Sequence, residues 1–127
     1  MRALVIDDSR VMRRIVAGSL HALGFETLEA QDGQEALDLL AAGEHADLAC
    51  IDWNMPVMDG LTFVTKVRAN PDLRGITLMM VTTESEESQI VRALAAGAHE
   101  YLIKPFTPDA IREKLEWLGL VPVGEHV

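Results

Sequence analysis

Short apolar segments alternate with amphipathic segments along this chain, and the apolar ones predict five β-strands. Three of them are continuously apolar, which is typical of strands buried on both faces of a sheet. A fourth alternates polar and apolar side chains, as a half-exposed edge strand does, and a fifth is only three residues long. In chain order, the predicted strands are residues 3–6, 26–30, 48–51, 76–81 and 101–103.

Between these segments the apolar side chains recur at helical spacing, which predicts five helices. Asp32 with Glu35, and Thr83 with Glu86, have the spacing of capping boxes, and Thr107 is followed by a proline suited to a first helical turn. The predicted apolar faces are Met12, Ile15, Val16, Leu20 and Leu23; Ala36, Leu37 and Leu40; Leu61, Val64 and Val67; Ile90, Val91, Leu94 and Ala98; and Ile111, Leu115 and Leu118.

Regular alternation of strand and helix predicts an α/β fold with a five-stranded parallel sheet and helices on both faces. The three continuously apolar strands should be central and the alternating strand should lie at an edge. The strand order 2-1-3-4-5 satisfies both conditions. We expect residues 1–119 to form one domain and residues 120–127 to form a C-terminal tail.

Composition narrows the possible functions. The 127 residues suffice for one domain with a real core, and no apolar run is long enough to cross a bilayer. A net charge of −9 argues against nucleic-acid binding, and the single cysteine, Cys50, excludes an internal disulfide. We therefore expect a cytoplasmic monomer that engages neither nucleic acid nor membrane.

Polar residues follow the predicted strands at their carboxyl ends. Asp7 and Asp8 follow the first strand, Asp52 the third, Thr82 the fourth and Lys104 the fifth. In a parallel sheet these ends lie along one edge, and ligands bind there where the strand order reverses. The sequence therefore predicts one crevice that contains three carboxylates.

Three carboxylates in one crevice repel one another, by about 4 kcal/mol for a pair at about 4 Å and an effective dielectric constant of about 20. A bound cation relieves this repulsion, and an all-oxygen ligand set favours Mg²⁺. A carboxylate can also act as a nucleophile toward phosphorus. Taken singly, Asp7 and Asp8 could cap a helix and Asp52 could begin a turn, but the combination favours phosphoryl chemistry.

At this point the sequence resembles the receiver domains of two-component response regulators, which have a flavodoxin-like (βα)5 fold. The resemblance extends from Ala3 to Leu118, and the motifs look most like the single-domain chemotaxis CheY branch. The stretches that carry it are Val5-Ile6-Asp7-Asp8-Ser9, Ile51-Asp52-Trp53-Asn54-Met55-Pro56, Met58-Asp59-Gly60, Val81-Thr82 and Tyr101-Leu102-Ile103-Lys104-Pro105-Phe106.

This resemblance implies that Asp52 is the phosphoacceptor. It implies that Asp7 and Asp8 hold Mg²⁺ together with Asp52, that the main-chain carbonyl of Asn54 is a further ligand, and that Lys104 contacts the phosphoryl group.

The resemblance also implies a conformational switch. Thr82 would be the hydroxyl that follows the phosphoryl group, and Tyr101 the aromatic side chain that changes rotamer with it. The Lys104–Pro105 peptide bond is often cis in this family.

We therefore expect a non-enzymatic, single-domain regulator that receives phosphate from a sensor histidine kinase. It would bind a downstream protein through the face formed by the fourth helix, fifth strand and fifth helix. Two alternatives stay open: a phosphorelay intermediate, and a phosphohydrolase that forms an aspartyl phosphate, although Asn54 stands where such enzymes usually carry a second acid. We expect the binding face to display Arg92, His99, Tyr101, Arg112 and Glu116.

Overall fold

The computed structural model describes residues 1–123, so residues 124–127 of the predicted tail lie outside the described part. Five parallel strands form one sheet in the order β2-β1-β3-β4-β5, which confirms the predicted topology. The strands are β1 Arg2–Ile6, β2 Glu26–Ala30, β3 Leu48–Ile51, β4 Thr77–Thr82 and β5 Glu100–Ile103.

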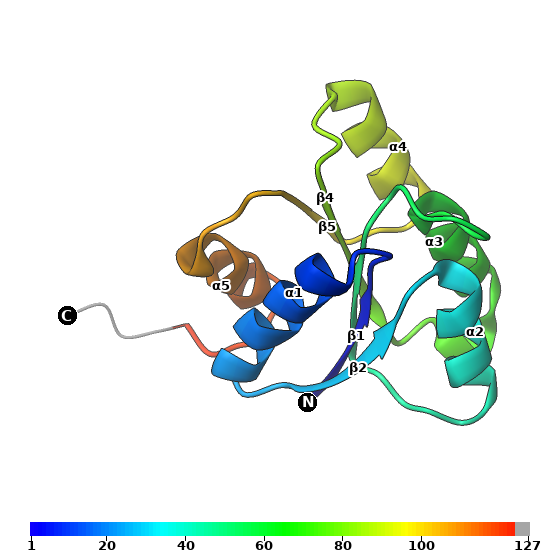
Figure 1. Cartoon of the computed structure of the whole chain (residues 1–127), viewed down its shortest axis with the longest axis horizontal. Helices are drawn as coiled ribbons and strands as arrows, with labels where there is room; N and C mark the ends of the chain where they lie inside the picture. The colour runs from blue at the N-terminus through cyan, green and yellow to red at the C-terminus, as the bar shows by residue number, and fades with distance from the viewer. Residues whose placement is uncertain (124–127) are drawn as a thin grey trace.

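Helices cover both faces of this sheet, as Figure 1 shows, with α1 and α5 on one side and α2, α3 and α4 on the other. Their bounds are α1 Arg10–Ala22, α2 Gly33–Ala41, α3 Gly60–Ala69, α4 Glu87–Ala96 and α5 Pro108–Trp117, with a 3-10 turn, η1, at Pro71–Leu73. Among the described residues, none of these helices is both long and apolar enough to cross a membrane.

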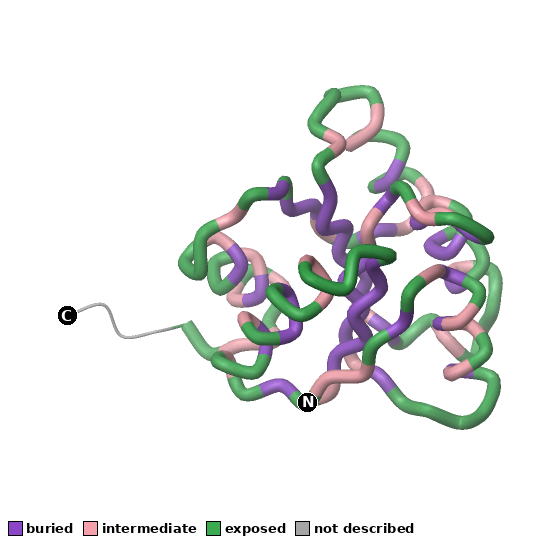
Figure 2. The backbone as a smooth tube through the Cα atoms, viewed as in Figure 1, coloured by how far each residue is buried: buried purple, intermediate pink, exposed green. Residues whose placement is uncertain are grey.

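Alternation along the central strands divides the core into two clusters. Leu4 and Ile6 of β1 pack with the side chains of α2, α3 and α4, whereas Ala3 and Val5 pack with those of α1 and α5. All four of these residues are essentially excluded from solvent, and the central strands form the buried spine in Figure 2. The continuous apolar runs in the sequence follow from burial on both faces.

Strand register brings the functional ends level with one another. Ile6 of β1 pairs with Ile51 of β3, and Thr82 of β4 pairs with Ile103 of β5. The residues that follow these strands therefore lie along the same edge of the sheet.

Most helices begin at a side-chain cap. Ser9, Asp32, Asp59 and Thr107 each accept a hydrogen bond from the main-chain N–H three residues further on. The capping box predicted at Thr83 and Glu86 is wrong, because α4 starts only at Glu87 and has no side-chain cap. The predicted first turn is instead a loop, in which the main chain of Glu84 bonds to the side chains of Thr82 and Tyr101.

Candidate functional site

Three carboxylates meet at the carboxyl end of the sheet. Oxygen atoms of Asp7, Asp8 and Asp52 all lie within 4.8 Å of one another. Asp7 is buried, Asp52 is half-buried and Asp8 is exposed, so the cluster extends from the protein interior to solvent. An all-oxygen cluster of like charge is a suitable ligand set for a hard divalent cation.

Both carboxylate oxygens of Asp7 are occupied by hydrogen bonds. Oδ1 accepts the main-chain N–H of Ser9 at 2.9 Å, and Oδ2 accepts the ammonium of Lys104 at 2.6 Å. Its main-chain carbonyl accepts from the guanidinium of Arg13 at 2.7 Å, and this guanidinium also pairs with Glu29 at 3.0 Å. Asp7 thus joins β1 to the start of α1 and to the residue that follows β5.

Lys104 is the buried cation of the site. Its side chain is only 6% exposed, and its ammonium lies 3.8 Å from Oδ1 of Asp52, in addition to its shorter contact with Asp7. The Lys104–Pro105 peptide bond is cis. Two carboxylates therefore share one ammonium in a place that water reaches poorly.

Asp52 is held in place by main-chain and side-chain donors. Its Oδ1 accepts the main-chain N–H of Trp53 at 2.9 Å, and the hydroxyl of Thr82 lies near its carboxylate. Partial burial raises the pKa of Asp52, against the opposing charge of Lys104, while the charge of Asp7 raises it further and the nearby Thr82 hydroxyl lowers it. A negative charge on Asp52 beside that of Asp7 is therefore costly unless further positive charge is supplied.

A crevice of about 350 Å³ opens over these groups. Thr82 is fully buried behind it, whereas its neighbour Thr83 is exposed and lines its mouth. The lining residues are Asp7, Asp8, Ser9, Met12, Asp52, Thr83, Lys104 and Pro105.

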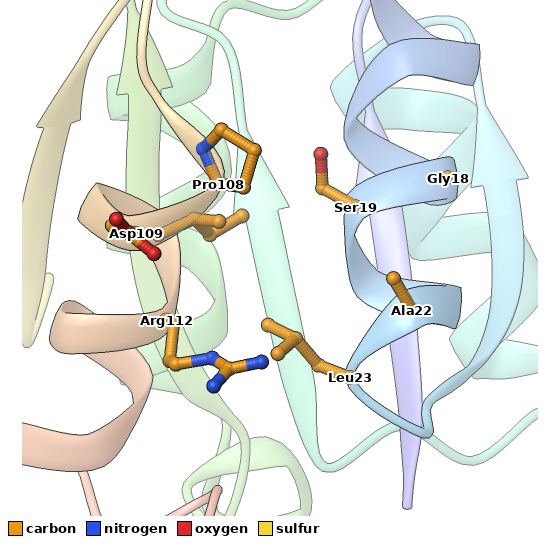
Figure 3. Close-up of a pocket in the computed structure, with 8 residues that line it drawn as sticks. Gly18, Ser19, Ala22, Leu23, Pro108, Asp109 and Arg112 are labelled. Atoms are coloured by element: carbon orange, nitrogen blue, oxygen red, sulfur yellow. The ribbon is translucent and has the colours of Figure 1, made fainter. Parts of the chain in front are cut away.

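A second hollow, of about 290 Å³, lies between α1 and α5 (Figure 3). Ser19 faces Pro108 across it and Leu23 lies opposite Arg112, and its charged groups are Asp109 and Arg112. It contains no carboxylate cluster, so the crevice at the sheet edge is the candidate site.

Glu84 connects the site to Tyr101. Its side chain accepts from the amide of Asn54 at 2.7 Å, its main-chain N–H donates to the hydroxyl of Thr82 at 3.3 Å, and its carbonyl accepts the hydroxyl of Tyr101 at 2.6 Å. These bonds hold the loop before α4, which explains why the helix starts late. The sequence singled out Thr82 and Tyr101 but not Glu84, because a role that depends on its main chain leaves no signal in residue type.

Tyr101 is turned inward, with 6% of its surface exposed. The expectation that it is displayed on the outer face is therefore wrong for this conformation. The phenol ring packs in the core beneath α4, and its hydroxyl reaches the loop that leads from Thr82.

The loop between β3 and α3 has two further features. The guanidinium of Arg92 on α4 lies 5.9 Å from the centre of the Trp53 ring, within the range of a cation–π contact. At Val57 the main chain makes a tight turn with φ of 68°, closed by a 2.7 Å hydrogen bond from Met58 N–H to the carbonyl of Pro56. Val57 is 82% exposed, so its side chain does not stabilise this unfavourable conformation.

The structure brings together Asp7, Asp8, Asp52, Thr82 and Lys104, all of which the sequence predicted to share one crevice. Asn54 lies beside them, with its side chain bonded to Glu84. The arrangement combines a half-buried carboxylate, a cluster of three carboxylates suited to a cation and a buried ammonium, a set of groups whose chemistry suits acceptance of a phosphoryl group.

Comparison with known proteins agrees with this geometry. Residues 3–116 match the response regulator receiver domain. The chain is 47% identical over 117 residues to a chemotaxis protein CheY homolog of Campylobacter jejuni, covering 91% of this chain and 90% of that protein. It is 46% identical to the chemotaxis protein CheY1 of Helicobacter pylori, covering 91% and 94% of the two chains.

A solved structure of chemotaxis protein CheY4 from Vibrio cholerae has the same fold, with a TM-score of 0.83 and 35% identity. The match covers 91% of this chain and 96% of that one. The resemblance inferred from the motifs is therefore confirmed.

Proposed function

The chain belongs to the response regulator receiver domain family, and on this premise we propose that it is a chemotaxis-type phosphoacceptor switch in which Asp52 takes the phosphoryl group. The observation that carries the proposal is the meeting of Asp52 with two further carboxylates and the buried ammonium of Lys104. A hydroxyl from Thr82 completes the set.

Phosphoryl transfer would begin from a phosphohistidine of a sensor kinase. A carboxylate oxygen of Asp52 attacks phosphorus, the phosphorus–nitrogen bond breaks, and the imidazole nitrogen keeps the electron pair and can take up a proton. The main-chain N–H of Trp53 donates to Oδ1 of Asp52 at 2.9 Å and so orients the carboxylate for attack on phosphorus.

Asp7, Asp8 and Asp52 would hold Mg²⁺, with the main-chain carbonyl of Asn54 as a further ligand. The fit rests on the chemistry of the donors, which are all oxygen and lie within 4.8 Å of one another for the three carboxylates. When bound, Mg²⁺ supplies positive charge to the phosphoryl oxygens.

Lys104 and Thr82 act on the same oxygens from the protein side. The ammonium of Lys104 is within 3.8 Å of Asp52 and is held by Asp7, so it can stabilise negative charge that develops beside Asp52. The buried hydroxyl of Thr82 lies near the Asp52 carboxylate, so it can donate to a phosphoryl oxygen there.

The switch then passes from Thr82 to Tyr101 through the loop at Glu84. This loop is bonded to both residues, so a shift of the Thr82 hydroxyl changes the position of the carbonyl that holds the Tyr101 hydroxyl. A new charge at Asp52 thereby biases a two-state element.

The output surface in this proposal is the face of α4, β5 and α5, which would bind a downstream protein. Exposed apolar side chains there, Val91, Leu94 and Ile103, suit a protein partner. The segment before α4 is acidic and carries no lysine, so the partner would need a complementary surface. We infer signalling through binding, with self-phosphorylation and autodephosphorylation as the protein's only chemistry.

Intact-mass measurement tests the proposal. Incubation with acetyl phosphate and Mg²⁺ should add one phosphoryl group to the wild type, and Asp52→Asn should abolish the addition. Asp38→Asn serves as the matched control, because it removes an exposed carboxylate on α2 outside the crevice, and it should be labelled like the wild type. Equal labelling of Asp52→Asn and wild type would contradict the assignment.

A further inference from the structure

Arg68, near the end of α3, lies at the amino ends of β4 and β5, at the opposite end of the strands from the crevice. Its guanidinium donates to the main-chain carbonyls of Gly97 at 2.9 Å, Arg74 at 3.1 Å and Ile76 at 3.0 Å. These acceptors belong to the end of α4 and to the segment that leads into β4. One side chain therefore ties α3, α4 and β4 together.

His99 completes this network from the start of β5. Its Nδ1 lies 3.0 Å from the main-chain nitrogen of Leu78 and 3.0 Å from Nη2 of Arg68. Its main-chain N–H donates to the carbonyl of Leu78 at 2.8 Å. Both neighbours of Nδ1 are donors, so this nitrogen acts as the acceptor in the neutral ring, and the same Nη2 of Arg68 lies further away, 3.3 Å, from Nε2.

Gly97 fixes where the end of α4 meets Arg68. Its φ of 124° lies in the left-handed region that favours glycine, and a Cβ there would lie 2.2 Å from Cγ of Arg68. The helix end and the arginine side chain thus pack more closely than any other residue type permits.

We propose that Arg68 and His99 form an acid-sensitive clamp, which holds the C-terminal end of α4 while His99 is neutral and releases it when the ring is protonated. Protonation places a hydrogen on Nδ1, opposite the N–H of Leu78 and the guanidinium of Arg68. Leu78 has no exposed surface, so its N–H would lose a partner that water does not readily replace.

The charges around the ring act in the same direction. Arg68 of α3 is the charged group that faces it, and a protonated ring would stand beside a second cation. Arg74 contributes only its carbonyl to the network, and the carboxylate of Glu100 is turned to Lys114 of α5. Among the described residues, no recorded carboxylate contact compensates a positive charge on His99.

Partial burial, and then the charge of Arg68, lower the pKa of His99 from its ordinary value of 6.5. As the pH falls, His99 is therefore protonated at a higher pH in the unfolded chain than in the folded chain. The contribution of the clamp to folding stability is complete above the ordinary pKa and is lost as the pH falls through the lower, folded-state pKa. His99 remains accessible to solvent, so protons reach it without unfolding.

Such a clamp would affect signalling because α4 forms part of the proposed output face. While its C-terminal end is fixed, movement transmitted from the site is confined to its N-terminal end, where Glu84 and Tyr101 meet. Release in acid would let the whole helix shift. This consequence rests on the proposed function, whereas the clamp itself does not.

Nuclear magnetic resonance titration of the unphosphorylated protein tests the clamp without Mg²⁺ or phosphodonor, from about pH 8 to about pH 5. The His99 ring should titrate at a pH below the ordinary histidine pKa of 6.5. The amide signals of Leu78, Gly97 and Ala98 should move with the midpoint of the His99 ring.

Two variants sharpen the test. His99→Asn supplies a carbonyl acceptor that does not titrate, so these amide shifts should become independent of pH, whereas His45→Asn should leave them as in wild type. A His99 ring that titrates at or above pH 6.5, or unchanged pH-dependent amide shifts in His99→Asn, would overturn the clamp. Because no phosphorylation is involved, either result leaves the proposed function of Asp52 to its own labelling test.

Discussion

The carboxyl ends and the amino ends of the parallel strands differ in how their polar side chains are buried and bonded. At the carboxyl edge lie all three buried polar or charged side chains of the described residues, Asp7, Thr82 and Lys104. At the opposite edge, Arg68 and His99 remain partly accessible and bond mainly to main-chain groups. The first edge holds side-chain charge out of water in the crevice that we propose accepts a phosphoryl group. The second edge joins α3, α4 and β4 mainly through main-chain acceptors, and by our proposal it releases α4 when His99 is protonated.

Removal of the buried ammonium should have the largest effect on stability. Lys104→Met leaves Asp7 buried without its cation, which should lower the free energy of unfolding by about 3–5 kcal/mol. Lys114→Met breaks a more exposed pair with Glu100 and should cost about 1 kcal/mol or less. Urea unfolding in the presence of a chelator measures both.

Excess Mg²⁺ should restore part of the stability of Lys104→Met, because a bound cation would compensate the negative charge of the carboxylates that have lost the ammonium. Equal losses of unfolding free energy for Lys104→Met and Lys114→Met would show that the buried pair and the more exposed pair contribute alike.

A methyl group at Gly60 should have the next largest effect. Its Cβ would lie 2.2 Å from the main-chain oxygen of Asp52, which cannot move without shifting the end of β3. We expect Gly60→Ala to lose about 3 kcal/mol of stability and to slow labelling of Asp52. Gly18→Ala is the matched control, because it adds a methyl group to open space within α1 and should not destabilise the protein. Thermal unfolding that finds Gly60→Ala as stable as Gly18→Ala would refute the close approach.

A methyl group at Gly97 on the opposite edge should matter less, because it meets a side chain. Gly97→Ala should lose about 2 kcal/mol, part from its φ of 124° and part from contact with Arg68. Gly43→Ala has a comparable φ of 97° with nothing within 4 Å of the new atom, so it should lose only about 1 kcal/mol.

Chemical denaturation in an Arg68→Ala background separates the two contributions of Gly97. The loss caused by Gly97→Ala should fall to that of Gly43→Ala there, and an unchanged loss would show that Arg68 and Gly97 do not constrain each other.

The smallest expected change concerns the connection between the site and α4. Tyr101→Phe removes the donor to the carbonyl of Glu84 and should lose about 1 kcal/mol in urea unfolding. Glu84→Gln keeps that carbonyl, and its side-chain oxygen can still accept from Asn54, so its stability should stay close to wild type. A larger loss for Glu84→Gln than for Tyr101→Phe would mean that the side chain, and not the main chain, holds this loop.

Sequence pattern predicted the strands and most helices because each depends on local residue types. The alternation at 26–30 marks an edge strand, and the spacing of Asp32 to Glu35 marks a cap that the structure confirms. The capping box at Thr83 failed because nonlocal bonds to Thr82 and Tyr101 hold the main chain of Glu84 outside the helix.

For the site, the sequence predicted which side chains meet but not how they share partners. Strand ends in a parallel sheet bring Asp7, Asp52 and Lys104 together whatever their individual contacts. The bond from Lys104 to Asp7 rather than Asp52, at 2.6 against 3.8 Å, depends on side-chain geometry across 97 residues of sequence separation. The network of Arg68 and His99 depends likewise on tertiary contact and left no local pattern.

Asp7 has a consequence for how sequences with this architecture can diverge. Its two oxygens serve different segments, one the start of α1 through Ser9 and the other the residue after β5 through Lys104. An asparagine would keep only one of these acceptors, and a glutamate would displace both by a methylene group. A replacement at position 7 therefore disturbs the start of α1 and the residue after β5 at once, whereas exposed Asp8, its neighbour, can be replaced at little cost to the fold.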